Sequence, residues 1–295
     1  MPANGIIVHC RAKINLTLDI LDKRQDGYHN LKSVMQSVDI ADTLHIKKNA
    51  TGSIKITTSL PDLPTGTENT VYSASELFFS AAGIDSGISI FIEKRIPHQA
   101  GMGGGSSDAA GALLGLNKLF GSHLSINRLT DLASQIGSDV PYFLYGGTAV
   151  ISGRGEIVEK LPDVPKLDLV IVKPDVGVST AWAYKRLAET DRLKSSAATD
   201  AVVDAIKRGD RAAVIINMSN DFDDIVALEF SEIAEIKNRL YSLGAERAML
   251  SGSGAAVFSV FDSSNSAANA ARIMKPDYPF VVATATATEA VCMEM

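Results

Sequence analysis

The sequence is poor in cysteine, in positive charge and in long apolar segments. Its 295 residues include only two cysteines, Cys10 and Cys292, which lie far apart and without metal-ligand spacing. This argues against a disulfide-stabilised secreted scaffold and against a cysteine-based zinc site, so we interpret both residues as reduced thiols of a cytoplasmic protein. No apolar run approaches the roughly 20 residues that span a bilayer. The first residues also lack the basic region and apolar core of a signal peptide.

Acidic residues outnumber basic ones, 34 to 28, and the formal net charge is −6. No cluster of Lys and Arg is present, which argues against a general nucleic-acid-binding protein. We therefore expect a small-molecule substrate, no nucleic acid or membrane as partner, and a monomer or homodimer. A content of 46% hydrophobic and 21% charged residues is typical of globular proteins, and 295 residues suffice for one large or two moderate domains.

The most informative stretch is a glycine-rich segment at 97–108. Four of the residues 101–105 are glycine, which leaves a backbone free to adopt positive φ and to approach a ligand closely. Residues 106–108 favour a helix start, and apolar residues recur at helical spacing up to Phe120. An alternating, strand-like segment at 87–94 precedes the glycines. A loop that leads into a helix N-terminus offers N–H groups and the positive end of a dipole, which suit a phosphate.

Two common phosphate-binding motifs are excluded. Walker A requires a Lys followed by Ser or Thr after its last glycine, whereas this sequence has Ser106, Ser107 and Asp108 there. The dinucleotide fingerprint requires a third small apolar residue where Ser106 stands. A flexible turn or tight helix packing is the alternative to a phosphate site, and the order of strand, loop and helix favours the phosphate site.

The N-terminal segment 6–21 alternates as a strand does. Ile14 and Leu16 have one parity, while Lys13 and Asn15 have the other and therefore point to the same side. A solvated strand face is the alternative to a site here, because most such polar positions face water.

A polar turn follows the first strand and closes with Asp26-Gly27, a strong hairpin signal. The returning strand is predicted at 35–46. Tyr28 and His29 come directly after the turn, where an aromatic pair taken alone most often serves packing.

Asp139 lies between a helix-ending glycine and a Pro-aromatic segment, a position that rarely holds a freely solvated charge. Structural capping of a helix is the alternative role for it. Asn69 opens a predicted helix and suits a capping position as well. Residues 248–258 fit a strand, a glycine turn and a strand, which a simple glycine hairpin also explains. The acidic segment 220–224 fits a solvated helix start better than a metal site.

Further elements follow from periodicity and from turn residues. The strands are predicted at 53–58, 146–150, 167–173 and 280–286. The helices are predicted at 71–82, 126–136, 181–187, 200–208, 210–218, 230–243 and 263–274.

The segment from Pro97 to Ala110 resembles the second motif of the GHMP kinase superfamily, which includes galactose, homoserine and mevalonate kinases. The Lys13-Ile14-Asn15 strand is similar to its first motif, and 248–258 is similar to its third. The triple glycine with two serines, together with Gly27-Tyr28-His29, is most similar to the branch that phosphorylates a cytidylylated methylerythritol in the non-mevalonate isoprenoid pathway.

This resemblance implies an α+β, two-domain GHMP-kinase-like fold with the active site in the cleft between the domains. It implies an N-terminal ATP- and phosphate-binding domain at 1–163 and a C-terminal substrate-side domain at 164–295. It also implies ATP as phosphoryl donor, Mg²⁺ as its partner, and transfer of the γ-phosphoryl group to the 2-hydroxyl of the methylerythritol unit.

The resemblance further assigns roles to individual residues. It makes Lys13 and Asp139 catalytic and makes Ser107 a candidate Mg²⁺ ligand. The ATP-binding residues that it implies are Asn69, Lys94, Pro97, Gly101, Met102, Gly103, Gly104, Gly105, Ser106 and Ser107. The substrate-binding residues are Asn15, Tyr28, His29, Thr180, Tyr184, Gly252 and Ser253. Tyr28 and Tyr184 are expected to clamp the cytosine and His29 to hydrogen-bond it.

Three alternatives stay open. Trp182 rivals Tyr184 as the second aromatic, and Lys94 could be an ordinary surface lysine. Another small-alcohol kinase of the superfamily would share the loop but would have no need of Tyr28 and His29. A nucleotide-binding regulator on the same fold would have no need of the Lys13 and Asp139 pair, so the presence of both favours an enzyme.

Overall fold

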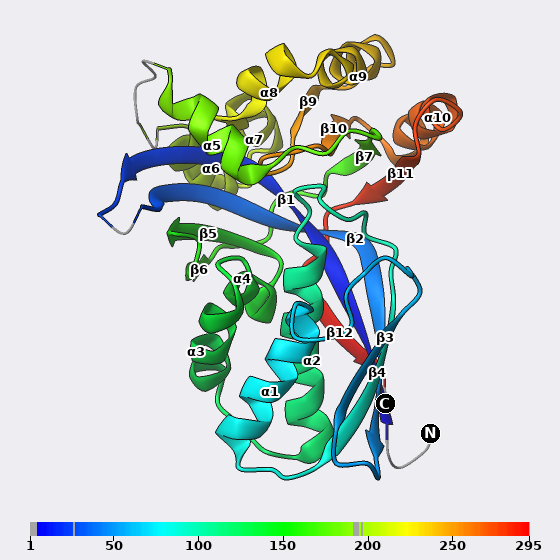
Figure 1. Cartoon of the computed structure of the whole chain (residues 1–295). Helices are drawn as coiled ribbons and strands as arrows, with labels where there is room; N and C mark the ends of the chain where they lie inside the picture. Colours follow the sequence, from blue (N-terminus) through cyan, green and yellow to red (C-terminus); the bar gives the residue numbers. More distant parts are fainter. Residues whose placement is uncertain (1–4, 26, 191–194, 196, 295) are drawn as a thin grey trace.

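A long β-hairpin connects the two parts of the molecule. The computed structural model describes residues 5–25, 27–190, 195 and 197–294. Strands β1 (Gly5–Lys23) and β2 (His29–Asn49) pair antiparallel and run from the lower part, which holds α1 to α4, into the upper part, which holds α5 to α10 (Figure 1). The returning strand begins at His29, six residues before the predicted start, so Tyr28 and His29 sit at the tip of the hairpin. Asp26 of the predicted turn lies outside the described residues.

The first sheet is built on this hairpin, in the order β12-β1-β2-β4-β3, with β5 beside β2, β6 beside β5 and β8 beside β1. Its other strands are β3 (Ile54–Thr58), β4 (Gly87–Glu93), β5 (Thr148–Gly153), β6 (Ile157–Lys160), β8 (Ser219–Asn220) and β12 (Val291–Glu294). Four helices lie on one side of it: α1 (Thr70–Ala82), α2 (Gly104–Phe120), α3 (Ile126–Ile136) and α4 (Val140–Tyr145). Apolar side chains of these helices and of β1, β2 and β4 form one core.

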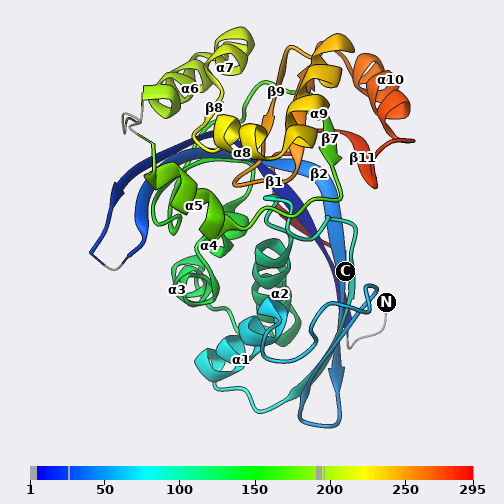
Figure 2. The ribbon, with the colours of Figure 1, turned by 45° about the horizontal axis from the view of Figure 1, so that its top comes forward.

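The second sheet is antiparallel, with the order β11-β7-β10-β9. Its strands are β7 (Asp168–Lys173), β9 (Arg247–Leu250), β10 (Val257–Phe261) and β11 (Phe280–Ala285). The helices around it are α5 (Thr180–Ala188), α6 (Ala197–Arg208), α7 (Arg211–Asn217), α8 (Asp223–Glu229), α9 (Ser231–Ser242) and α10 (Ser264–Met274) (Figure 2). One core joins α6 and α7 to this sheet and to the middle of β1, and a further core joins α8, α9 and α10.

The predicted α+β fold is confirmed, and the differences from the prediction concern short elements and burial. Helix α4 and strands β6, β8 and β12 were missed, because none exceeds six residues and so none shows a full hydrophobic period. The acidic segment at 220–224 does begin a helix, α8. Strand β12 returns to pair with β1, although the predicted boundary at 163 and 164 groups it with the second part; that boundary stays a prediction.

The polar face of β1 is not solvated. Lys13, Asn15, Thr17 and Asp19 are all buried, at 3% exposure or less. The alternative of a solvated strand face is therefore wrong, because β1 lies between the two parts and is covered on both sides. Buried polar groups require hydrogen-bonding partners, so this row forms an internal network.

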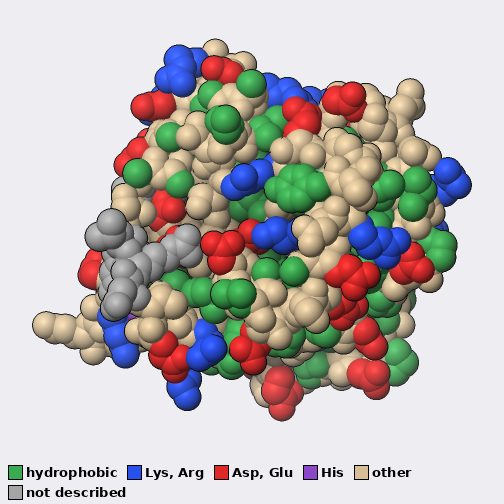
Figure 3. Space-filling view, turned by 90° about the horizontal axis from the view of Figure 1, so that it is seen from above, with side chains coloured by type: hydrophobic (Ala, Val, Ile, Leu, Met, Phe, Trp, Pro, Cys, Tyr) green, Lys and Arg blue, Asp and Glu red, His purple; other side chains and the backbone are tan. Residues whose placement is uncertain are grey.

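The outer surface of the upper part carries mixed charge. Seen from above, Lys and Arg side chains lie scattered among Asp and Glu (Figure 3). Within the described ranges, no helix combines the length and the apolar character needed to cross a membrane.

Candidate active site

Lys13 and Asp139 meet where the first sheet faces the end of α3. The Lys13 Nζ lies 3.6 Å from Asp139 Oδ2, and its side chain is 4% exposed against 34% for Asp139. Lys13 Nζ also donates to Asn15 Oδ1 at 2.7 Å, and Asn15 Nδ2 donates to Ser33 Oγ at 2.8 Å. The ammonium group is thus held in a fixed place while the carboxylate stays accessible, as a proton acceptor must be.

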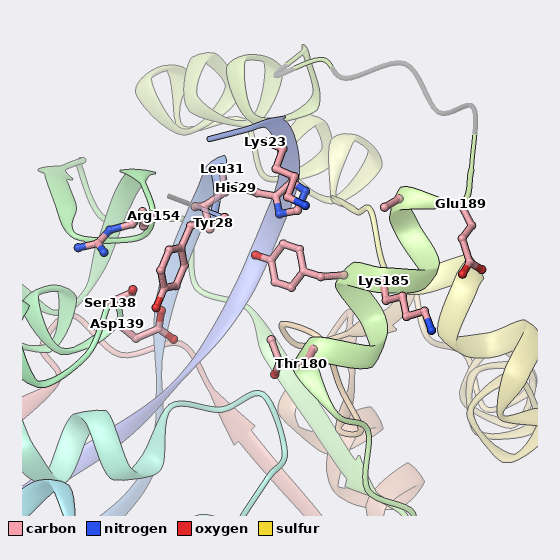
Figure 4. A pocket seen from close by; sticks show the side chains of 14 residues that line it. Lys23, Tyr28, His29, Leu31, Ser138, Asp139, Arg154, Thr180, Lys185 and Glu189 are labelled. Carbon is pink, nitrogen blue, oxygen red and sulfur yellow. The ribbon is translucent and has the colours of Figure 1, made fainter. Parts of the chain in front are cut away.

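Asp139 does not act as a helix cap. It occupies the position before α4, yet its side chain makes no capping hydrogen bond. The capping alternative is therefore wrong, and the carboxylate is directed towards Lys13 and the pocket instead (Figure 4).

The glycine loop adopts the positive φ angles that the sequence led us to expect, but only two of its four glycines do so. Gly101 and Gly103 have φ of 71° and 70°, whereas Gly104 and Gly105 are helical and already form the first turn of α2. The helix therefore begins two residues before the predicted serine start, with Gly103 as its cap. The Met102 carbonyl accepts the Lys13 backbone N–H at 3.0 Å, which holds the loop against β1.

Most other side chains of the loop region are bonded or buried. Met102 is 1% exposed, so it can offer a ligand only its backbone. The Ser107 hydroxyl is buried and donates to the Arg11 carbonyl at 2.7 Å. Ser106 and Pro97 are half-buried. Asn69 caps α1, since its Oδ1 accepts the Val71 N–H at 2.9 Å, so the capping role considered for it is present.

The glycine turn between β9 and β10, here called the third glycine segment, packs on the glycine loop that precedes α2. Ser251 Oγ donates to the Gly101 carbonyl at 2.9 Å, and a Cβ on Gly101 would lie only 1.9 Å from the Ser251 carbonyl oxygen. The buried Asn220 donates to the Gly252 carbonyl at 2.8 Å and so fixes this turn from β8. Sequence reasoning missed Asn220, because its partner lies 32 residues away and no local pattern marks it.

Lys94 is not a surface lysine. Its Nζ donates to Asp42 Oδ2 and, at 2.7 Å, to Asp108 Oδ2, and all three side chains are at most 6% exposed. Asp42 Oδ1 also accepts the backbone N–H groups of Arg95 and Ile96, at 2.5 and 2.8 Å. This triad of Asp42, Lys94 and Asp108 therefore joins the segment that precedes the glycine loop to β2, through Asp42, and to α2, through Asp108.

The triad carries one more negative than positive group. Burial is the main reason that the pKa of Asp108 rises, to about 7; the attraction of Lys94 lowers this pKa, and the repulsion of Asp42 raises it by a smaller amount. Asp108 Oδ1 has no hydrogen-bond partner. Sequence reasoning treated Asp108 only as a helix-start residue and missed Asp42, because the charges meet across separations of 52 and 14 residues.

We expect Lys94→Met to destabilise the fold by about 3–5 kcal/mol, because it leaves two buried carboxylates without a cation. Asp108→Asn is the matched control and should cost clearly less, because Lys94 keeps Asp42 as its partner. Urea unfolding at pH 8 measures both. Equal and small effects of the two variants would show that the triad does not hold the loop.

A pocket of about 820 Å³ lies beside Asp139 (Figure 4). Its walls come from the hairpin tip, the loop before α4, the β5–β6 turn and α5. The lining side chains that bear on function are Tyr28, His29, Asp139, Arg154, Thr180 and Tyr184. Thr180 Oγ1 lies 2.9 Å from Ser253 Oγ, so α5 and the third glycine segment meet at its edge.

Aromatic rings form one side of this pocket. The His29 ring stacks on Tyr184 with centroids 5.0 Å apart and an interplanar angle of 22°, and Phe222 supports Tyr184 edge-on. Burial, with a smaller contribution from Asp139, raises the pKa of Tyr184 to about 12, so its hydroxyl stays protonated at neutral pH. Trp182 packs against Phe230 instead, and it is not among the residues that line the pocket.

The predicted site residues therefore fall into two groups. The glycine loop, the third glycine segment and Lys13 form one region. Tyr28, His29, Thr180 and Tyr184 line the pocket. Asp139 lies next to both, since it pairs with Lys13 and lines the pocket. Asn15 is buried behind Lys13, so the structure places it to orient that residue. A hydroxyl group held in the pocket beside Asp139 could lose its proton to that carboxylate.

Two protein-family models match this chain. The model described as the GHMP kinases N terminal domain matches residues 69–147, and the model described as GHMP kinases C terminal matches residues 202–279. The two matches lie on either side of the loop that leads to α5.

Several curated proteins are similar to the chain over nearly its whole length. A 4-diphosphocytidyl-2-C-methyl-D-erythritol kinase of Pelotomaculum thermopropionicum is 45% identical over 273 residues, which is 92% of this chain and 95% of that protein. A protein of the same name from Caldicellulosiruptor saccharolyticus is 41% identical and covers 95% of this chain and 97% of its own length.

Solved structures are similar too. A crystal structure of 4-(cytidine 5'-diphospho)-2C-methyl-D-erythritol kinase has a TM-score of 0.80 at 32% identity, covering 95% of this chain and 98% of that one. Homoserine kinase from Cytophaga hutchinsonii has a TM-score of 0.81 at 20% identity, covering 99% and 98%, and this likeness shows a common fold alone.

Proposed function

The chain belongs to the GHMP kinases, and from its 4-diphosphocytidyl-2-C-methyl-D-erythritol kinase relatives we propose that it phosphorylates 4-diphosphocytidyl-2-C-methyl-D-erythritol. The expected family membership is thereby confirmed, and the protein is a phosphotransferase of the non-mevalonate route. The finer proposal is that the γ-phosphoryl group of ATP goes to the 2-hydroxyl of 4-diphosphocytidyl-2-C-methyl-D-erythritol.

One observation carries this proposal. Asp139, paired with Lys13, opens on the same pocket as Tyr28, His29 and Tyr184. A substrate with a nucleobase at one end and an alcohol at the other can therefore stack its base on the aromatic rings while the alcohol reaches the carboxylate. Base stacking on aromatic side chains is a common way to hold a nucleotide.

Phosphoryl transfer needs mainly positioning and charge stabilisation from the protein. In the proposed mechanism Asp139 accepts the proton of the substrate hydroxyl as that oxygen attacks phosphorus. Lys13, 3.6 Å from the Asp139 carboxylate, supplies a fixed positive charge that stabilises negative charge on the transferred group. Because Asn15 holds Lys13 Nζ, the cation needs no reorganisation during the reaction.

GHMP kinases use ATP as the phosphoryl donor, and we propose that its phosphates bind at the loop from Gly101 to Ser106. The first turn of α2 begins with Gly104 and Gly105, so the N–H groups of these two residues can be approached without steric hindrance from Cβ atoms. Lys94 is neutralised by two carboxylates, and we propose that it supports this loop rather than the phosphates themselves.

Mg²⁺ is proposed as the partner of ATP, as expected for nucleotide phosphates, whose charge the ion neutralises when bound. Among the described residues no group of three or more His, Cys, Asp or Glu side chains could hold a metal ion. The Ser107 hydroxyl is directed to the Arg11 carbonyl, which does not favour it as a ligand. The described part of the chain therefore forms no metal cage of its own.

We also propose that residues 1–163 bind ATP and that residues 164–295 complete the substrate side, as the contribution of α5 to the pocket suggests. A cytoplasmic location is proposed because Cys10 and Cys292 are both free.

A coupled ADP-release assay over a panel of alcohols tests the proposed function. The panel holds the cytidylylated methylerythritol, methylerythritol phosphate without the cytidylyl group, homoserine and mevalonate. We expect turnover with the first compound alone. Turnover with homoserine or mevalonate but not with the cytidylylated compound would contradict the proposed substrate and would show that the protein is a GHMP kinase of another specificity.

Removing the ring of Tyr28 should weaken substrate binding without affecting ATP. If the ring stacks on cytosine, Tyr28→Ala costs about 1–3 kcal/mol of base binding, which is about 5- to 150-fold in affinity. His29→Ala should in addition reduce the preference for cytidine over uridine, because a base edge loses its hydrogen-bonding partner.

The measurement is KM for the cytidylylated and uridylylated substrates. Tyr184→Ala should behave like Tyr28→Ala, whereas Trp182→Ala is the matched control, because Trp182 contacts Phe230 and does not line the pocket. A Tyr28→Ala protein with normal KM would contradict the assignment of the pocket to the base.

A further inference from the structure

The turn between β5 and β6 touches both functional parts of the pocket. Gly153 pairs with Leu31 of β2, so this turn lies beside the tip of the hairpin that carries Tyr28. Gly153 and Gly155 have φ of 71° and 120°, backbone angles that only glycine adopts easily. Arg154 stands between these two glycines, and strand pairing holds the turn next to the part of the pocket that Tyr28 lines.

Arg154 lies over the ring of Tyr28. Its guanidinium carbon is 5.2 Å from the centre of that ring, within the range of a cation–π contact. Glu156 holds the arginine from the other side, because its Oε1 lies 3.8 Å from Arg154 Nε and its Oε2 accepts the Arg154 backbone N–H at 2.6 Å. In Figure 4 the ring of Tyr28 stands between Arg154 and the interior of the pocket.

The neighbouring glycine packs on the catalytic loop. A Cβ on Gly155 would lie 3.2 Å from the Ser138 Cβ and 3.6 Å from Asp139 Oδ1. The same four-residue turn therefore contacts the ring assigned to the base and lies next to the carboxylate assigned to the proton.

We propose that Arg154 is a positioning residue for base recognition, which holds the ring of Tyr28 in place as one wall of the base site before the substrate arrives. Tyr28 is 56% exposed and lies at the tip of a hairpin, so an unsupported ring would lose conformational freedom on binding. A guanidinium placed over this ring removes part of that cost. This inference rests on the proposed function.

Arg154 is also a cation on the wall of a pocket proposed to take a nucleoside diphosphate. Lys23, Lys185, Asp139 and Glu189 line the same pocket, so its charge is mixed. A direct contact of Arg154 with the diphosphate is the competing role. A phosphate contact would make the loss of affinity on replacing Arg154 depend on the phosphates of the ligand. A positioning role would make that loss depend on the ring of Tyr28.

Calorimetric titration with cytidine and with CDP separates these roles. Arg154→Gln should weaken both ligands by the same factor, about 2- to 5-fold, the range expected for a partly exposed cation–π contact. KM for the full substrate should rise by the same factor, while kcat and KM for ATP stay at the wild-type values. Arg154→Lys keeps the charge but not the planar fork, so it should fall between wild type and Arg154→Gln.

The decisive arm is a double-mutant cycle. In a Tyr28→Ala background, Arg154→Gln should have no further effect on cytidine affinity. An undiminished effect in that background, or a loss seen with CDP but not with cytidine, would overturn the positioning role in favour of a phosphate contact. A wild-type protein that binds cytidine no better than uridine would overturn the proposed base site itself. That result is distinct from the two results that would overturn only the role of Arg154.

Discussion

Asp139→Asn is expected to lower kcat by about 10²- to 10⁴-fold, the scale of a lost general base. The substitution keeps the shape of the side chain but removes its ability to accept a proton. Because Asp139 makes no capping hydrogen bond, the fold does not depend on its carboxylate, and α4 should form as before. Lys13 keeps Asn15 as a partner, so it is not left alone in the interior.

The measurement is ADP release at saturating substrates, with thermal unfolding to check the fold. Asp277→Asn is the matched control, because it removes an equal charge from an exposed ion pair with Arg239. That variant should turn over at the wild-type rate. A folded Asp139→Asn protein with nearly normal kcat would remove this residue from the chemistry.

Gly101→Ala is expected to reduce kcat/KM for ATP by about 10²-fold or more, because displacements near 1 Å in a positioning loop have effects of that size. The added Cβ would lie 1.9 Å from a backbone oxygen of Ser251, so the phosphate loop and the third glycine segment cannot keep their contact. Backbone atoms on both sides leave no flexible side chain to move aside.

Gly83→Ala controls for backbone strain. Gly83 ends α1 with φ of 63°, and a Cβ there would meet nothing within 4 Å. Both substitutions should cost about 1–2 kcal/mol of stability for the left-handed backbone, but only Gly101→Ala should affect ATP. Calorimetry with a non-hydrolysable ATP analogue checks this, and equal affinities in both variants would show that the nucleotide binds elsewhere.

The sequence predicted the glycine loop and its context, but not which glycines carry the unusual backbone. A run of glycines permits positive φ anywhere within it. Which residues use that freedom is decided by contacts with distant segments: Phe143 and Lys13 at Gly103, and Ser251 at Gly101. For the same reason the start of α2 was placed two residues late, on the serines.

The burial and charge partners of a side chain were harder to predict than the face of the strand on which it lies. Alternation in β1 correctly placed Lys13 beside Asn15, but it could not tell a solvated face from a buried one, and the second part of the chain buries this face. Lys94 shows the same limit, since its two carboxylate partners come from β2 and α2. Local patterns report periodicity, whereas burial and charge pairing depend on long-range packing.

The choice between Tyr184 and Trp182 illustrates a smaller limit. The two residues lie two positions apart and therefore on opposite sides of one short helix, and either ring suits a nucleobase. Only the packing of α5 distinguishes them, because Phe230 receives Trp182 while Phe222 supports Tyr184 at the pocket. A helix of nine residues with one buried alanine gives the sequence too little pattern to decide this.

The central claim is transfer of a phosphoryl group from ATP to an alcohol that carries a cytidine diphosphate, and ³¹P NMR of the reaction tests it most directly. We predict one new phosphate-monoester resonance that grows in step with ADP, while the two diphosphate resonances of the cytidylylated methylerythritol persist. Formation of ADP with only inorganic phosphate, or cleavage of the diphosphate, would contradict the proposed reaction.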